Sequence, residues 1–156
     1  RNQGWKKGKD GKWAKPEKAE KSSALLQFKV AKADATRKQV FGWAAIATDK
    51  DGNEIVDLQK DIIAPEDLEL AAYDFVLHSR EAGEMHESGG HGRVIESLAV
   101  TAEKKAALGV ASDAMPSGWW IGFQLDEETF KRVQAGELSM FSIQGKATRE
   151  QIQEAA

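Results

Sequence analysis

Residues 118–147, GWWIGFQLDEETFKRVQAGELSMFSIQGKA, contain three local structures in succession. The first eight residues are apolar and aromatic, as is typical of a strand. Residues 126–136 then predict a short helix, with Asp126 as its N-cap and Gly136 just past its end. Residues 139–147 predict a last strand. Because no regular β–α–β repetition surrounds this segment, it favours an α+β fold over a parallel α/β fold.

Upstream residues extend this fold. Residues 62–83 predict a helix that begins at Pro65, because proline suits the first helical position and acidic residues follow it. Its apolar face should contain Leu68, Ala71, Ala72 and Phe75. The expected architecture is a largely antiparallel sheet or barrel with two or three helices. The remaining features are strands at 24–33, 38–47 and 92–101, a turn centred on Asp51-Gly52 and a glycine-rich loop at 84–92.

Charge separates a basic N-terminal segment from an acidic remainder of the chain. Residues 1–22 carry a net charge of +5, which leaves −8 for the rest because the whole chain is −3. We expect a basic flexible arm or linker at 1–22, a folded domain at 23–148 and a tail or linker helix at 149–156. The chain begins without Met, and we expect it to be a fragment of a longer protein. Trp5 and Trp13 could stack on nucleic-acid bases, but the acidic body favours a linker instead.

Composition excludes several classes of protein. No apolar run approaches the roughly 18 residues that a membrane-spanning helix needs. Cysteine is absent, so disulfides, thiolate catalysis and cysteine-based zinc sites are excluded, and a reducing compartment fits. The glycines of ESGGHG do not match a phosphate-binding loop. We therefore expect no membrane binding and no nucleotide cofactor.

Two residue types point to nucleophilic catalysis. On the last predicted strand, Ser142 faces away from Phe141 and Ile143 and could line a groove, although most strand serines are structural. His86 lies in the glycine-rich loop, where a loop can present an imidazole to a cleft as the base for a serine. A loop histidine without a catalytic role is the alternative. His78, near the end of the long helix, suits an ordinary surface or capping role.

Glu96 is unusual in its predicted strand. Alternation places it on the same face as Val94, Leu98 and Val100, where an ionised carboxylate is costly without a partner. A histidine that becomes cationic during catalysis would be one suitable partner. A lysine or arginine pair, or a strand edge open to water, would also explain it.

A metal site is a further alternative. His86, Glu87 and His91 could bind a divalent cation, and Asp57 and Asp61 could join them. However, this loop lacks the helical spacing that places two imidazoles on one face in an HExxH motif. We therefore expect no metal ion and no other cofactor.

Four segments in this order resemble the XkdF-type phage serine proteases, which are relatives of the prohead maturation proteases. Together they extend over about residues 38–148, and the basic arm is not included. Their order and spacing make the match more specific than any single motif. The segments are VFGWAAI, VDLQKDIIAPEDLELAAYDF, EMHESGGHGRVIES and the stretch 118–147 quoted above.

The resemblance implies a distorted β-barrel surrounded by helices, as in the herpesvirus assembly proteases. It also implies a serine endopeptidase that cleaves scaffold or capsid proteins inside the assembling prohead, in the bacterial host cytoplasm. The family's catalytic serine, histidine and acid fall on Ser142, His86 and Glu96. Gln144 departs from the pattern, because relatives often have a second glycine there, and this leaves the oxyanion hole undefined.

The expected partners are therefore protein substrates, including the chain's own flanking segments. Ile152-Gln153-Glu154 fits the form thought to precede the cut in proteases of this kind. A homodimer is one open arrangement, and nucleic-acid binding is not expected. The alternative function is a catalytically inactive protease-fold module of the virion or scaffold.

Overall fold

The structure is a computed structural model, and its description extends over residues 6–7, 13–14, 30–57, 61–84 and 88–141. The chain divides into two compact units, one formed by Arg1–Leu26 with Lys146–Ala156 and the other by Gln27–Gly145. In the first unit, β1 (Lys6–Lys7) and β2 (Trp13–Ala14) form an antiparallel pair. The second unit contains every other helix and strand described below.

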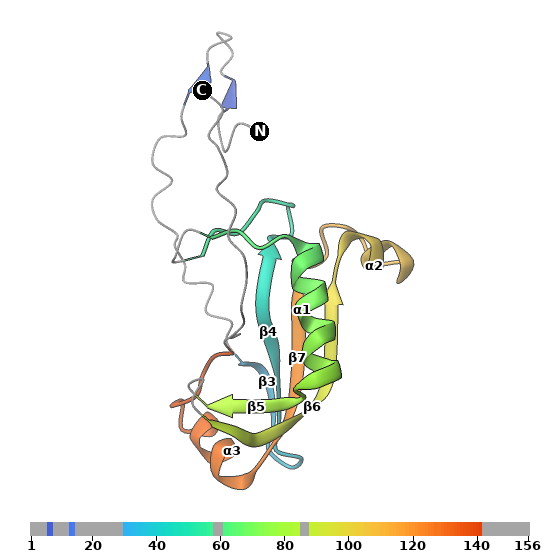
Figure 1. Cartoon of the computed structure of the whole chain (residues 1–156). Coiled ribbons are helices and arrows are strands. Elements are labelled where there is room, and N and C mark those ends of the chain that lie inside the picture. The colour runs from blue at the N-terminus through green and yellow to red at the C-terminus, as the bar shows by residue number, and fades with distance from the viewer. Residues whose placement is uncertain (1–5, 8–12, 15–29, 58–60, 85–87, 142–156) are drawn as a thin grey trace. The chain divides into compact units, whose positions relative to one another are not determined.

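A five-stranded sheet forms the centre of the second unit (Figure 1). Its order is β3-β4-β7-β6-β5, and every neighbouring pair is antiparallel. The central β7 is almost continuously apolar, as suits a strand between two long neighbours. The strands are β3 (Val30–Asp34), β4 (Gln39–Thr48), β5 (Glu81–Glu84), β6 (Ser88–Val100) and β7 (Ser117–Leu125).

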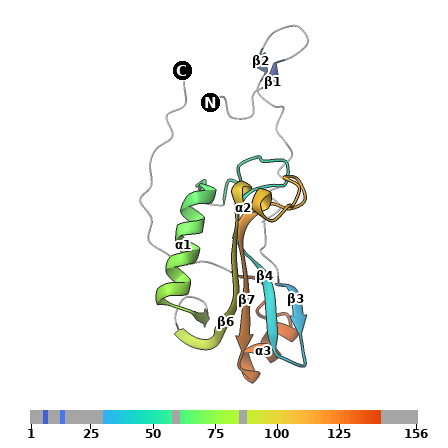
Figure 2. The same ribbon diagram turned by 90° about the vertical axis from the view of Figure 1, so that its right-hand side faces the viewer.

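Three helices accompany this sheet: α1 (Pro65–His78), α2 (Ala102–Ala107) and α3 (Glu127–Gln134). The predicted start of α1 at Pro65 is confirmed, and α1 lies along one face of the sheet (Figure 2). The predicted cap of α3 is also confirmed, because the Asp126 side chain accepts a hydrogen bond from the Thr129 amide at 2.7 Å. No helix in the described ranges is both long and apolar enough to cross a bilayer.

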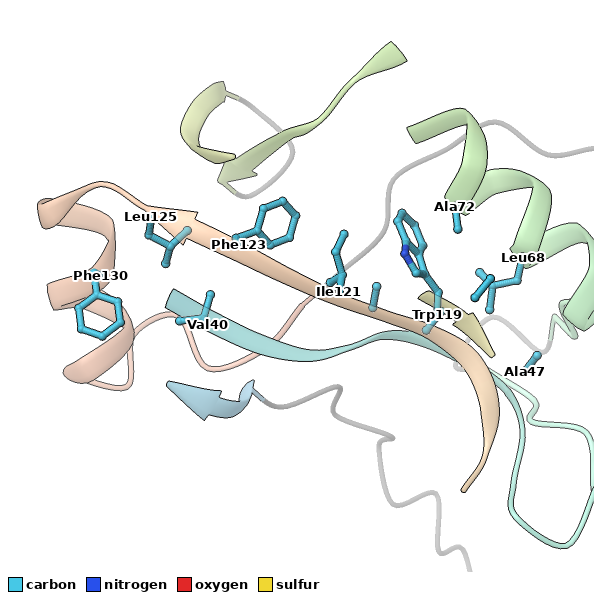
Figure 3. Close-up of a cluster of buried hydrophobic side chains, with 12 residues drawn as sticks. Val40, Ala47, Leu68, Ala72, Trp119, Ile121, Phe123, Leu125 and Phe130 are labelled. Atoms are coloured by element: carbon cyan, nitrogen blue, oxygen red, sulfur yellow. The ribbon is translucent and has the colours of Figure 1, made fainter. Parts of the chain in front are cut away.

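The core lies on the face of the sheet that α1 covers, and Phe130 of α3 joins it near Val40 and Leu125 (Figure 3). Leu68 and Ala72 of α1 are buried against it, and Trp119 and Phe123 of β7 both pack edge-on against Phe75. Such edge-to-face ring pairs add to the free energy gained from burying apolar area. Phe141 stacks on Phe123 with ring centroids 6.0 Å apart, so the residue just before Ser142 packs against the core.

Some local predictions were wrong or incomplete. Ala71 is exposed rather than part of the buried face of α1. The short β5 and α2 were not predicted: the EAGE of β5 has poor strand propensity and forms a strand by pairing with β6. Helix α2 has only six residues and is capped by Thr101. The predicted last strand at 139–147 lies mostly outside the described residues, as does the first half of the strand at 24–33.

Thus the α+β class and the antiparallel sheet are confirmed, but a barrel is not. In the described part of the chain the sheet is open, with β3 and β5 as its two edges. The predicted turn is present, and Gly52 has a φ of +84° there. Asp49 organises this turn, because its carboxylate accepts hydrogen bonds from the amides of Asp51 and Asn53.

One ion pair connects α1 to α2. The Lys104 ammonium lies 2.5 Å from Glu69 Oε1 and donates a hydrogen bond to the Tyr73 hydroxyl at 2.7 Å. The Tyr73 hydroxyl in turn donates to Glu69 Oε1 at 2.8 Å. The hydrogen bonds from Lys104 and then Tyr73 lower the pKa of Glu69 from its ordinary 4.5. Partial burial opposes the charge on Lys104, but its hydrogen bonds to Glu69 and Tyr73 outweigh this and raise its pKa above 10.5.

These shifts predict how stability depends on pH. The Glu69 contribution is present above pH 4.5 and is lost as pH falls through the lowered pKa of the folded state. The Lys104 contribution is present below pH 10.5 and is lost as pH rises through its raised pKa. We expect Glu69→Gln to lower the urea midpoint at pH 7 and to flatten its fall between pH 5 and about pH 3. Glu103→Gln on α2, which leaves the pair intact, should keep the acid dependence of the parent.

Candidate active site

Two of the three predicted catalytic residues, Ser142 and His86, lie outside the described residues, while their chain neighbours lie within them. Before Ser142, Phe141 packs into the core, and the Ser139 carbonyl accepts a hydrogen bond from the Val30 amide at 3.0 Å. On either side of His86, Glu84 of β5 pairs with Ser88 of β6. The structure therefore fixes the chain near both residues, and their catalytic assignment stays a prediction.

Glu96, the predicted acid, lies on β6, on the same face as Leu98, as alternation predicts, but not on the face of Val94. Val94 pairs with Phe123 of β7 and Glu96 pairs with Gly122, so two steps along β6 match one step along β7. This β-bulge at Ile95 turns the following residues over. Val94 packs against the core, whereas Glu96 is exposed. The prediction that the two share a face was therefore wrong.

Glu96 lies on what we call the outer face of the sheet, the face opposite α1, formed by Phe41, Trp43, Glu96, Leu98 and Trp120. The Trp120 indole Nε1–H donates a hydrogen bond to Glu96 Oε1 at 2.8 Å. The ring of Trp43 meets that of Trp120 edge-on, with centroids 5.6 Å apart and planes at 83°. One carboxylate oxygen of Glu96 is thus held by an indole that is itself packed against a second indole.

Gly122 makes room for this arrangement. Phe41 of β4, Gly122 of β7 and Glu96 of β6 form one row across the sheet. A Cβ atom at position 122 would lie 2.5 Å from Phe41 Cδ1 and 3.1 Å from Glu96 Cβ. Lys32 of β3 extends the row, with its ammonium 5.3 Å from the centroid of the Phe41 ring. The absence of a side chain at Gly122 therefore allows both Phe41 and Glu96 to take their places.

We predict that Gly122→Ala destabilises the protein by about 1–3 kcal/mol, because the Phe41 ring must move to admit the new methyl group. Urea unfolding measures the loss. Phe41→Leu should relieve part of it, so the double variant should be more stable than the sum of the two single effects. Strictly additive effects would contradict the contact between position 122 and the Phe41 ring.

The other histidines have structural surroundings. His78 Nδ1 lies 2.9 Å from Asp74 Oδ1 one helical turn earlier, with both side chains exposed. His91 Nδ1 lies 3.7 Å from Asp126 Oδ2 and 3.4 Å from the Thr129 hydroxyl, beside the cap of α3. Hydrogen bonds from Thr129, then the charge of His91, lower the pKa of Asp126 despite its slight desolvation.

The described residues do not assemble the alternative metal site. They contain no group of three or more histidine or acidic side chains that could hold an ion. His91 lies near Leu125, at one end of β7, because Asp126 donates its amide hydrogen bond to the His91 carbonyl. Asp57 and Asp61 follow the end of β4 that pairs with Ser117, at the other end of β7. His86 and Glu87 are outside the described ranges.

Sequence reasoning did not identify Trp120 or Gly122 as part of this region. The signal was present in the tryptophan pair of GWWIGFQL, because one of two consecutive strand residues must face away from the core. Here Trp119 is buried and Trp120 is half-buried on the outer face.

Comparison with known proteins identifies one family. Residues 27–151 match the family described as putative phage serine protease XkdF, a range that includes Ser142, His86 and Glu96. No curated protein and no solved structure matches the chain significantly. The match extends over most of the chain and includes the whole described sheet of the second unit. The chain therefore belongs to the XkdF family of phage serine proteases.

Proposed function

We propose that this chain is a serine endopeptidase of the prohead maturation type, with Ser142 as nucleophile, His86 as base and Glu96 as the acid of the triad. The observation that carries the proposal is the family match over residues 27–151, because it names serine protease chemistry and spans all three positions. No metal ion or organic cofactor enters this mechanism.

The described neighbour of Ser142 supports its role. Phe141 points into the core, where it stacks on Phe123. If the chain is extended across residues 141–143, as the sequence predicts, the Ser142 side chain points the opposite way, toward solvent and substrate. A nucleophile needs this combination of a fixed backbone and an accessible hydroxyl.

The surroundings of Glu96 support its role as the acid. Its carboxylate is exposed, and Trp120 holds one of its oxygens. Among the described residues, no lysine, arginine or histidine forms an ion pair with it. The carboxylate is thus available to a histidine, and one of the alternatives considered for Glu96, a lysine or arginine pair, loses support.

In the proposed reaction, His86 Nε2 takes the proton of Ser142 as Oγ attacks the carbonyl carbon of a peptide bond. Glu96 accepts a hydrogen bond from His86 Nδ1–H and stabilises the imidazolium that forms. The imidazolium then protonates the leaving amine, and water hydrolyses the acyl-enzyme by the same route in reverse. Backbone N–H groups that bind the oxyanion typically contribute ~3 kcal/mol each.

The proposed substrates are scaffold or capsid proteins, cleaved inside the assembling prohead in the bacterial host cytoplasm. We further propose that the fold closes into a distorted barrel through residues outside the described ranges. A homodimer is compatible with this function and is not required by it.

We expect the chain to cleave its own flanking segment after Glu154, where Ile152-Gln153-Glu154 is followed by Ala155. Intact-mass analysis of a longer version of the protein should reveal a product that ends at Glu154. Ser142→Ala should abolish that product, and Glu154→Ala should reduce it strongly. A product of the same mass in the Ser142→Ala variant would mean that another protease makes the cut.

The test of the proposed activity is labelling with a fluorophosphonate probe, which forms a covalent bond to an activated serine hydroxyl. We expect the parent to be labelled, and both Ser142→Ala and His86→Ala to lose the label, because the serine is a weak nucleophile without its base. His91→Ala serves as the control, since it changes a histidine of the same sequence region that lies beside the α3 cap.

A parent protein that takes no label, when folded and at high concentration, would favour the inactive virion or scaffold module. Label that persists in Ser142→Ala would show a different nucleophile and overturn the assignment. Equal loss of label in His86→Ala and His91→Ala would leave His86 without a specific role.

A further inference from the structure

We propose that the side of α1 turned away from the sheet is a homodimer interface, on which a second copy of this chain packs its own α1 in the antiparallel direction. The apolar centre of the interface is the outer stripe of α1, formed by Leu70, Tyr73 and Leu77. This inference goes beyond the proposed function and does not depend on it, because no residue of the outer stripe belongs to the proposed triad.

The outer stripe consists of three large apolar side chains in the open. Leu70 is 65% exposed, Tyr73 47% and Leu77 64%. Intervals of three and four residues place them in one line along the helix. Leu68 and Ala72 point the other way and are buried toward the sheet that α1 covers (Figure 2). The helix therefore has two apolar sides, of which the fold buries one.

Within the described ranges, no helix or strand packs on the outer stripe. The opposite side of α1 meets β4, β6 and β7. The contact with α2 is polar and lies at the edge of the stripe, where Lys104 donates to the Tyr73 hydroxyl. Single exposed leucines are common on protein surfaces. Two leucines seven residues apart, with an aromatic ring between them, instead have the spacing of a helix–helix seam.

The charges at the two ends of α1 favour a second copy in the antiparallel direction. Glu66 and Asp67 lie in the first turn, His78 lies in the last turn and Arg80 follows the end of the helix, and all four are exposed. An antiparallel pair brings the acidic start of each helix to the basic end of the other and aligns the two helix dipoles favourably. A parallel pair would bring the acidic first turns together.

The apolar residues fit the same arrangement. Leu70 and Leu77 lie at similar distances from the middle of the helix, on either side of Tyr73 and Asp74. With a two-fold axis beside this middle, Leu70 of each copy packs on Leu77 of the other. The contact thus occurs twice and is closed, as a symmetric dimer requires.

The same charges disfavour two other kinds of occupant. Glu66, Asp67 and Asp74 flank the outer stripe and are exposed. Carboxylates in these positions repel the phosphates of anionic lipids and of nucleic acids. The outer stripe therefore suits a helix with basic residues at the matching end, and α1 of a second copy has that composition.

The first test is sedimentation equilibrium of the 156-residue chain at concentrations up to about 1 mM. We expect a weak dimer of the 17.1 kDa chain, with a dissociation constant on the order of 100 μM, because a contact centred on one 14-residue helix is smaller than a standard interface. Leu77→Gln should weaken the dimer at least tenfold, since it changes two buried side chains per dimer. Leu108→Gln is the matched control: Leu108 is 66% exposed but lies on α2, and its substitution should leave the dissociation constant unchanged.

The second test measures the direction of pairing by disulfide crosslinking. The chain contains no cysteine, so introduced thiols give the only crosslinks. Under oxidised glutathione, a mixture of Leu70→Cys and Leu77→Cys chains should form the mixed disulfide about tenfold faster than either variant links to itself. In the antiparallel pair, like positions are about 10 Å apart along the helix axis, which is too far for a disulfide. This measurement also covers the case in which Leu77→Gln does not fold.

Each contrary result overturns a defined claim. A parent that stays monomeric at about 1 mM overturns the dimer and leaves the proposed protease function standing. A dimer that Leu77→Gln and Leu108→Gln weaken equally, or not at all, places the interface away from the outer stripe. Crosslinking of each variant to itself, faster than in the mixture, would contradict the antiparallel direction.

Discussion

The β-bulge at Ile95 determines which side chains of β6 face the core and which face outward. Before it, Val94 packs beside Phe123, and after it Ser97 and Ala99 face the core while Glu96 faces away. Because strand alternation has a period of two, a single extra residue exchanges the two faces. Without the bulge, Glu96 would lie among the core residues and its carboxylate would need a buried partner.

The packing around the bulge stabilises this orientation of the β6 side chains. Trp119 extends into the core and its N–H bonds to Ser97, while Trp120 on the outer face bonds to Glu96. Gly122, the partner of Glu96 on β7, leaves space that the Phe41 ring occupies from β4. Side chains of the same three central strands, β4, β6 and β7, therefore form both the core and the outer face.

The sequence predicted the central strands β4, β6 and β7 and the helices α1 and α3, because their apolar patterns and caps are strong local signals. It could not predict the bulge, since a regular alternation of Val94, Glu96, Leu98 and Val100 fits an unbroken strand equally well. It also missed β5, which has no strand propensity of its own, and the hydrogen bond between Trp120 and Glu96, which depends on the register between two strands. The prediction of the catalytic positions depended on the family resemblance, because a single serine or histidine has no distinctive sequence pattern.

On the exposed outer face of the sheet, the Glu96 carboxylate accepts a hydrogen bond from Trp120. Because the chain belongs to a phage serine protease family, this carboxylate is the described group that we propose as the acid of the triad. The central claim is that Ser142, His86 and Glu96 converge. Its most direct test is a crystal structure of the protein after reaction with a fluorophosphonate. We predict a phosphonate ester on Ser142 Oγ, with His86 Nε2 beside it and Nδ1 within about 3 Å of Glu96 Oε2. A phosphonylated Ser142 with Glu96 remote from His86 would contradict the triad, and modification of another residue would contradict the nucleophile.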